Sequence, residues 1–459
     1  MAPLKVIIIG GGLAGTCLAN GLLNHSDSIS VTVYERDPQG SSRGGYQIRL
    51  GAHALTGFKA CLTKEQYARL LPLFGKSGGV VSSAPCIFSP SDLKVLIDLS
   101  KAPLYEKSAP IARTRLKDFL QKPLQEKDAI VYGKKYVRYE ILEGKMGQSI
   151  VRVHFDDGTW EDCNVLVSAE GSGSRTNKQI GLDNIITEVK PGHGGFLGKC
   201  HLPWSVLQTL PRQLLEKGTI YTGNSKAMVF AAAYLPESLS QQSSDKPINY
   251  DEEQASLFLG MAWTTGPSSK DLPEDIDKKA LMREKLTEAG FHPDFHKLVD
   301  AVDNEDLMTT PWRYAKSDTP VNWRQKLLTK TPNVDIAHPR VWLIGDSIHP
   351  MLPSRGMGAN NAIHDTADAL GPLLELARMD GVITDDAVSA HLTIYEEAMM
   401  PRAFDWVKKS SNQQLPDLDS LTGKGIILGL KVVLLVVSGW VGVLKVFGWT
   451  PTDDAPELA

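Results

Sequence analysis

The stretch Val6-Ile7-Ile8-Ile9-Gly10-Gly11-Gly12-Leu13-Ala14-Gly15 decides the fold. Its first four residues form a continuous β-branched run, which is typical of a strand that is covered on both faces. Three glycines follow in the pattern GxGxxG, and Leu13–Leu23 has the composition of a helix. A second strand is predicted at Val31–Tyr34. We therefore predict a strand–turn–helix–strand unit that belongs to a parallel sheet.

The glycine turn predicts a binding site for the pyrophosphate of a dinucleotide. Gly10 permits the tight turn, Gly12 lets the backbone approach the anion, and Gly15 allows close packing of helix on strand. The N-terminus of the helix offers free N–H groups and the positive end of its dipole. Glu35 closes the second strand, 20 residues after Gly15, where a carboxylate can accept hydrogen bonds from an adenosine ribose. A solvated Glu35 is the alternative, but the complete unit favours dinucleotide binding.

A second glycine turn, late in the chain, favours FAD over NAD, because a ribose-binding glutamate suits either. Val341–Ile344 is predicted to be a strand, and Gly345-Asp346 follows it. Asp346 can hold a ribityl hydroxyl or position the loop. After a loop marked by prolines, Gly358 and Ala359 lie in a turn that opens a helix. N–H groups at that helix N-terminus can stabilise negative charge at the N1–C2 edge of a reduced flavin.

Together these segments resemble the class A flavoprotein monooxygenases of the p-hydroxybenzoate hydroxylase type. That family has a GxGxxG turn and a later Gly-Asp segment followed by His, Pro and GxGxN, which Gly345–Asn360 matches. Arg113–Leu120 matches the family's arginine followed by leucines, and Val165–Arg175 is similar to its middle motif. The middle motif departs from the pattern at Glu170, where the family has aspartate. This departure puts a role of Glu170 in handling NADPH in doubt.

The resemblance implies that FAD is bound tightly and that NADPH binds transiently, reduces the flavin and leaves. It also implies that Arg113 lies against the FAD and that the loop 43–47 passes the isoalloxazine end. The predicted cofactor-binding residues are Gly10, Gly12, Gly15, Glu35, Gly45, Arg113, Asp346, Gly358 and Ala359.

No catalytic base is assigned from the sequence. His349 is interpreted as a structural loop residue rather than a base. Four polar residues of the middle region could orient or deprotonate a phenol, although ordinary structural roles stay open for each: Lys199, His201, Tyr221 and Tyr234.

The predicted fold class is α/β, with a Rossmann-type FAD-binding domain, an inserted, mainly antiparallel β-sheet substrate domain and a C-terminal hydrophobic helix. Met228–Leu235 and Ser256–Trp263 have strand composition and do not alternate with clear helices, which favours the antiparallel sheet. We assign residues 1–80, 105–187 and 330–410 to the FAD-binding domain, 81–104 and 188–329 to the substrate domain, 411–424 to a linker and 425–449 to the helix.

Composition excludes several classes of protein. The formal net charge of −4 gives no basic surface for a nucleic acid. The five cysteines are scattered without a CxxC pair, so no metal site or redox dithiol is predicted and a reducing compartment is favoured.

The expected function is hydroxylation of an electron-rich, apolar aromatic substrate by FAD, NAD(P)H and O2 in secondary metabolism. An epoxidase of an isoprenoid-type alkene is the alternative enzyme, because the same reduced flavin can serve both reactions. A membrane-held flavoprotein without turnover is the alternative from another class. A flavin-dependent halogenase is disfavoured, because the chain has no Trp-x-Trp-x-Ile-Pro sequence.

The segment Gly425–Trp449 is apolar except for Lys431 and Lys445. As a helix it would be about 37 Å long, enough for a hydrocarbon core of ~30 Å. Its flanking charges predict a cytosolic catalytic body, and the membrane would then supply an apolar substrate. The uncharged run Val432–Leu444 has only 13 residues, so a helix that lies on the interface or docks on the sheet domain stays open.

Overall fold

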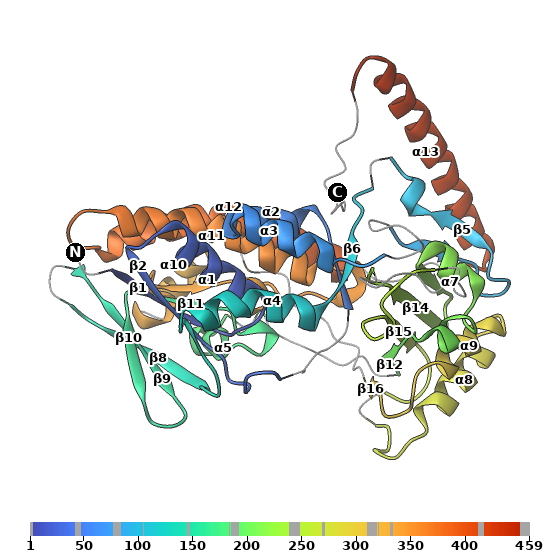
Figure 1. Cartoon of the computed structure of the whole chain (residues 1–459), viewed down its shortest axis with the longest axis horizontal. Coiled ribbons are helices and arrows are strands. Elements are labelled where there is room, and N and C mark those ends of the chain that lie inside the picture. Colours follow the sequence, from blue (N-terminus) through green and yellow to red (C-terminus); the bar gives the residue numbers. More distant parts are fainter. Residues whose placement is uncertain are drawn as a thin grey trace.

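Two sheets with separate hydrophobic cores make up the body of the protein, and a long helix projects from it (Figure 1). The computed structural model describes residues 3–41, 47–76, 84–103, 105–144, 147–182, 184, 192–237, 248–268, 271–309, 319, 321–330, 334–411 and 417–449. The α/β architecture with a β-rich second unit is confirmed.

The first sheet is five-stranded and parallel, in the order β17-β11-β1-β2-β7. The β-branched run of β1 is buried on both faces, as predicted, because helices cover the sheet. The strands are β1 (Leu4–Ile9), β2 (Ile29–Tyr34), β7 (Ile130–Val131), β11 (Val165–Ser168) and β17 (Val341–Leu343). The larger helices that share its core are α1 (Leu13–His25), α2 (Ala52–Cys61), α4 (Arg113–Glu126), α11 (Gly358–Arg378) and α12 (Asp385–Ser411).

Two smaller sheets adjoin this unit. An antiparallel three-stranded sheet is formed by β8 (Tyr136–Leu142), β9 (Ile150–Phe155) and β10 (Trp160–Cys163). The pair β3 (Gln47–Leu50) and β6 (Ala109–Ala112) lies between the two main units, since Gln47 Nε2 donates to the carbonyl of Ala232 in the second sheet at 2.6 Å.

The second main sheet has seven strands in the order β16-β12-β15-β14-β13-β4-β5, and all pairs are antiparallel except β13–β4. Both strands predicted in this region are observed, as β14 (Ala227–Tyr234) and β15 (Ser256–Trp263). The others are β4 (Cys86–Phe88), β5 (Val95–Asp98), β12 (Gly194–His201), β13 (Thr219–Gly223) and β16 (Leu307–Thr309). One face packs on a core to which α7 (Arg212–Lys217), α8 (Lys278–Glu288) and α9 (Asp294–Asp300) contribute.

Helix α10 (Trp323–Lys330) packs with the first core, although the expected limits placed it in the substrate domain. Trp323 is buried in that core, and Arg324 pairs with Glu396 of α12 at 2.9 Å. We therefore propose that the limit between the two domains lies before Trp323.

The C-terminal helix α13 extends over Leu421–Val446, so it begins earlier than the predicted Gly425 and includes part of the expected linker. Ser420 caps it by accepting a hydrogen bond from the N–H of Gly423 at 2.9 Å, which sets the earlier start. Among the described residues, α13 is the one helix that is long and apolar enough to cross a membrane by length and composition. Its N-terminal end lies beside β5, and its C-terminal end projects away from the body (Figure 1).

Candidate functional site: two glycine turns at one sheet edge

The first glycine turn is shaped by close backbone contacts. Gly10 has a φ of +111°, and a Cβ there would lie 2.3 Å from the carbonyl oxygen of Ala169, which follows β11. A Cβ at Gly15 would lie 2.2 Å from the carbonyl oxygen of Gly10. At Gly12, in contrast, a Cβ would meet no atom of the described residues within 4 Å. The turn therefore leaves open space above the N-terminus of α1, where an anion can approach the backbone.

Glu35 lies beside this turn, as predicted from its position after β2. Its carboxylate accepts hydrogen bonds from the backbone N–H groups of Gly11 and Asp37, each at 2.9 Å. Gln121 of α4 donates to the carbonyl of Gly11 at 2.8 Å and so fixes the other side of the turn. A carboxylate has about four acceptor positions, so Glu35 keeps capacity for ribose hydroxyls.

The second glycine turn lies at the same edge of the parallel sheet. It begins after β17, where the N–H of Ile344 and the hydroxyl of Ser347 both donate to the carbonyl of Ser168, at 3.0 and 2.7 Å. A Cβ at Gly345 would lie 2.9 Å from the Cβ of Ala362 on α11 and 4.0 Å from that of Ala14 on α1. The two turns, more than 300 positions apart in the chain, thus converge on one place.

Asp346 and Arg113 are brought together in this region. Burial raises the pKa of Asp346, and the positive charges of His349 and Arg113 oppose that rise. Arg113 is the first residue of α4, and Gly358 is the first residue of α11. A Cβ at Gly358 would lie 3.8 Å from a carboxylate oxygen of Asp346, so the start of α11 faces this carboxylate. Ala359 follows in the first turn of α11. Gly45 lies outside the described residues.

A buried ion network supports the second turn. The carboxylate of Asp365 on α11 pairs with His349 at 2.6 Å and with Arg402 of α12 at 2.7 Å, and it accepts the N–H of Gly345 at 2.7 Å. Burial disfavours the charged form of His349 and would lower its pKa. The interaction with the carboxylate of Asp365 is stronger than this effect, so the pKa of His349 is raised. His349 is fully buried, in agreement with its interpretation as a structural residue.

This network predicts a loss of stability in acid. Burial would raise the pKa of Asp365, but His349 and Arg402 lower it to about 2. Because the pKa is lower in the folded state, the stabilisation is present above about pH 4 and is lost as the pH falls toward 2. We expect urea unfolding to show a loss of roughly 2 kcal/mol over this range. The Asp365→Asn chain should show a smaller acid dependence; an identical acid dependence would contradict this assignment.

Glu170, the departure from the family pattern, is occupied in capping a helix. Its carboxylate accepts hydrogen bonds from Thr176 Oγ1 at 2.6 Å, from Ser168 Oγ at 2.8 Å and from the N–H groups of Arg175 and Thr176 at 3.0 and 3.1 Å. Arg175 and Thr176 are the first two residues of α5 (Arg175–Ile180), so Glu170 binds free N–H groups at the start of this helix. The longer side chain of glutamate thus serves the local fold.

The face of the second sheet that turns away from its core carries a row of aromatic side chains. Tyr221, Phe230 and Phe258 come from three adjacent strands, with ring centroids 6.4 and 5.9 Å apart along the row. All three are partly exposed. Burial raises the pKa of Tyr221, and the positive charge of Arg355 opposes the rise. Arg355 precedes α11, so the row lies near the loop that follows the second glycine turn.

The other polar candidates occupy different surroundings. Tyr234 is buried and its hydroxyl bonds Arg115 and the carbonyl of Leu73, both at 3.1 Å, which is a structural role. Lys199 is half-buried, and burial lowers its pKa. His201 is exposed at the end of β12.

Several residues of this site are missing from the predicted set. Asp365 and Arg402 meet only because the consecutive helices α11 and α12 pack against each other, and no local pattern shows which of their side chains meet. Phe230 and Phe258 could have been found, because their alternation with buried positions along the strands marks the second face of the sheet.

Comparison with known proteins agrees with this geometry. A family model described as FAD binding domain matches residues 204–410. The dual O-methyltransferase/FAD-dependent monooxygenase elcB of Phaeosphaeria nodorum is 28% identical over 397 residues, 80% of this chain and 40% of that protein. The 6-hydroxynicotinate 3-monooxygenase of Bordetella bronchiseptica is 23% identical over 372 residues, 79% and 81% of the two chains. A crystal structure of a FAD containing monooxygenase from Photorhabdus luminescens superposes with a TM-score of 0.65 at 25% identity, covering 89% and 96% of the two chains.

The parallel sheet, the open glycine cradle and the joined antiparallel sheet define a FAD-binding oxidoreductase fold. The chain is similar to FAD-dependent monooxygenases over about four fifths of its length, and its fold resembles that of the class A enzymes. It spans about two fifths of the length of the first curated relatives that it matches.

Proposed function

We propose that the protein is a monooxygenase that uses FAD, NAD(P)H and O2 to hydroxylate an electron-rich, apolar aromatic substrate in secondary metabolism. The observation that carries this proposal is the convergence of both glycine turns at one sheet edge, with Gly345 beside Ala14. In this reaction one oxygen atom enters the substrate and the other leaves as water, while NAD(P)H supplies two electrons. Bound FAD would supply the activation of O2.

We assign the cofactor contacts as follows. Gly10, Gly12 and Gly15 shape the cradle for the pyrophosphate, and the N-terminus of α1 stabilises its charge. Glu35 would bind the adenosine ribose, and its position beside Gly11 supports this role. The other assigned contacts are made by Arg113, Asp346, Gly358 and Ala359, and Gly45 stays a prediction.

The aromatic row supports an apolar ring as the substrate. Phe230 and Phe258 offer ring faces and edges against which an aromatic substrate can pack, and Tyr221 adds a hydroxyl for orientation. Arg355 places a positive charge near Tyr221, which can favour a phenolate over a phenol. These residues would hold the ring and exclude water, and none is assigned as a base.

A turnover experiment tests the proposed reaction. The purified chain with FAD is given NADPH, O2 and a panel of apolar phenols and isoprenoid alkenes, and products are identified by mass spectrometry. We expect NADPH oxidation to be faster with a phenol and to yield a product heavier by one oxygen atom. An epoxide from an alkene would support the alternative enzyme. Flavin that is reduced and reoxidises with every compound but leaves no product would contradict a monooxygenase.

We also propose that α13 attaches the protein to a membrane, with the catalytic body on the cytosolic side. Two observations support this proposal. The surface of α13 is apolar and largely exposed, and α13 is the one described helix that is long and apolar enough to cross a membrane. Lys408, Lys409 and Lys424 precede the apolar segment, in agreement with a cytosolic body. An attached enzyme would take an apolar substrate from the lipid.

A further inference from the structure

We propose that α13 lies in the plane of the membrane within one leaflet and does not cross the bilayer. This inference rests on the proposed membrane attachment and specifies its geometry. Three features carry it: the docking of the lower half of α13, the position of its lysines, and its uncharged free face.

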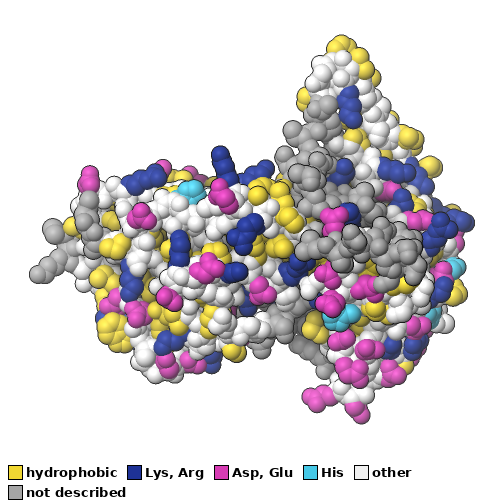
Figure 2. Space-filling view, in the orientation of Figure 1, with side chains coloured by type: hydrophobic (Ala, Val, Ile, Leu, Met, Phe, Trp, Pro, Cys, Tyr) yellow, Lys and Arg dark blue, Asp and Glu magenta, His cyan; other side chains and the backbone are white. Residues whose placement is uncertain are grey.

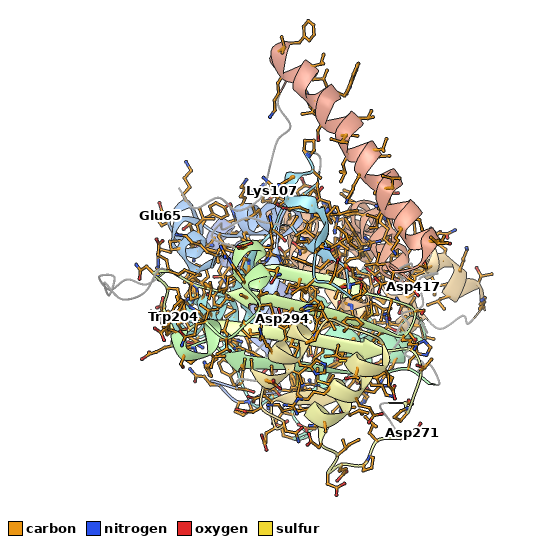
Figure 3. The ribbon with its side chains drawn as sticks, turned by 90° about the vertical axis from the view of Figure 1, so that its right-hand side faces the viewer. Glu65, Lys107, Trp204, Asp271, Asp294 and Asp417 are labelled. Atoms are coloured by element: carbon orange, nitrogen blue, oxygen red, sulfur yellow. The ribbon has the colours of Figure 1, made fainter. Side chains whose placement is uncertain are left out.

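The lower half of α13 is docked on the edge of the second sheet. Ile427 packs in a small core with Ile97 of β5 and Leu418, and Leu434 packs against the same core. Two hydrogen bonds hold the preceding segment: Ser225 Oγ to Asp417 at 3.0 Å and Ser91 Oγ to Asp419 at 3.1 Å. Figure 3 labels Asp417 at the lower end of the projecting helix.

This docking leaves too little helix to span a bilayer. The sheet edge beside α13 carries charged groups, including the ion pair of Asp98 with Lys217 at 2.8 Å. Since one side of α13 up to Leu434 is held on that edge, this part of the helix cannot pass through the hydrocarbon core unless these charges enter it as well. The remainder, Leu435–Trp449, would be about 22 Å long as a helix, which is short of the ~30 Å hydrocarbon core.

The lysines of α13 share one flank of the helix. Lys424, Lys431 and Lys445 are separated by multiples of seven residues, and Ser438 fills the remaining position of that repeat. Seven residues are close to two helical turns, so these side chains form a stripe that shifts by only about 20° per repeat. Lys424 and Lys431 border a hollow between α13 and Leu96 of β5. The stripe thus lies on the side of the body and extends along the whole helix.

The opposite face of α13 is apolar and has no partner among the described residues. Val436 and Trp440 expose 66% and 65% of their surface. Val432, Val443 and Phe447 extend this face in both directions. Figure 2 shows hydrophobic side chains along the projecting helix and basic ones near its base.

A helix with an apolar face along its length and lysines on one flank fits the interface of a membrane. In that orientation the apolar face enters the acyl chains, and all three lysines reach the headgroup phosphates of anionic lipids. End-on insertion would instead carry Lys445 deep into the hydrocarbon.

Depth measurements test the orientation. The five native cysteines are buried, so single cysteines placed on α13 can be labelled selectively with a fluorophore. Val436→Cys and Ser438→Cys form a matched pair, because they lie within about 3 Å along the axis but on different flanks. On vesicles of phosphatidylcholine with phosphatidylserine, we expect lipids with a quencher deep in the acyl chain to quench Val436→Cys strongly and Ser438→Cys weakly. Equal quenching of the pair would overturn the proposal.

Val432→Cys, Val436→Cys and Val443→Cys should share one depth, whereas a spanning helix predicts different depths. A tag after Ala459 should be digested by protease added to the side of the catalytic body, and protection of the tag would also overturn the proposal. Replacing the three lysines by glutamine should weaken vesicle binding by roughly fivefold per lysine.

Vesicle sedimentation separates this inference from the attachment on which it rests. The full chain should sediment with the vesicles, and the chain without residues 421–459 should not. If the full chain stays in solution, membrane attachment is wrong and the in-plane geometry fails with it. That result would leave the proposed hydroxylation standing, because the turnover experiment tests the reaction independently of membrane attachment.

Discussion

Replacing Arg402 by methionine is expected to lower the free energy of unfolding by roughly 3–5 kcal/mol. Arg402 bonds Asp365, Asp368 and Asn361, each at 2.7 Å, and so joins α12 to α11. Methionine retains much of the length of the side chain but leaves the fully buried carboxylate of Asp365 with His349 as its one cationic partner among the described residues. Urea unfolding of the Arg402→Met chain measures this loss.

Arg212→Met is the matched control, because it removes the same group from an exposed pair. Arg212 pairs with Glu216 one helical turn away at 2.7 Å, with side chains 87% and 51% exposed. We expect a change of about 0.3–0.5 kcal/mol there. Equal effects of the two substitutions would show that the buried network does not stabilise the second glycine turn.

Replacing Gly12 by alanine is expected to weaken FAD binding while leaving the fold intact. Gly12 has an extended backbone conformation that any residue adopts, and within the described part of the chain no atom lies within 4 Å of the added Cβ. The methyl group would occupy only the open space of the cradle. A tight contact of this kind costs roughly 1–3 kcal/mol, so FAD affinity should fall roughly 5- to 150-fold. Titration of the apoprotein with FAD, together with urea unfolding, separates the two effects.

Gly371→Ala on α11 is the control for this substitution, because a Cβ there also meets no atom within 4 Å among the residues that the structure describes. It should leave FAD binding unchanged and raise stability by up to about 1 kcal/mol, because alanine favours a helix. A Gly12→Ala chain that binds FAD as tightly as the original would place the pyrophosphate elsewhere.

The sequence predicts those parts of the site that local backbone geometry determines. The first glycine turn, Glu35 and the turn at Gly345 each combine a strand end with residues whose chemistry is legible within a short segment. Their convergence follows from parallel pairing, since β1, β11 and β17 end at the same edge. These features therefore needed no knowledge of distant contacts.

The remaining features depend on contacts between distant segments. The bond between Asp365 and Arg402 requires the packing of α11 against α12, and no periodic pattern specifies it. The proximity of Arg355 to Tyr221 depends on how the two sheets are joined. For α13, composition showed an apolar helix, but only its docking on Ile97 showed which part of it is available to a membrane.

The absorption spectrum of the purified full chain tests the central claim, that both glycine turns bind one FAD. The protein should elute with the visible absorption bands of a flavin, and denaturation should release FAD in an equal amount to the chain. Protein purified without cofactor should regain these bands when FAD is added. A colourless chain that FAD does not reconstitute would contradict the claim.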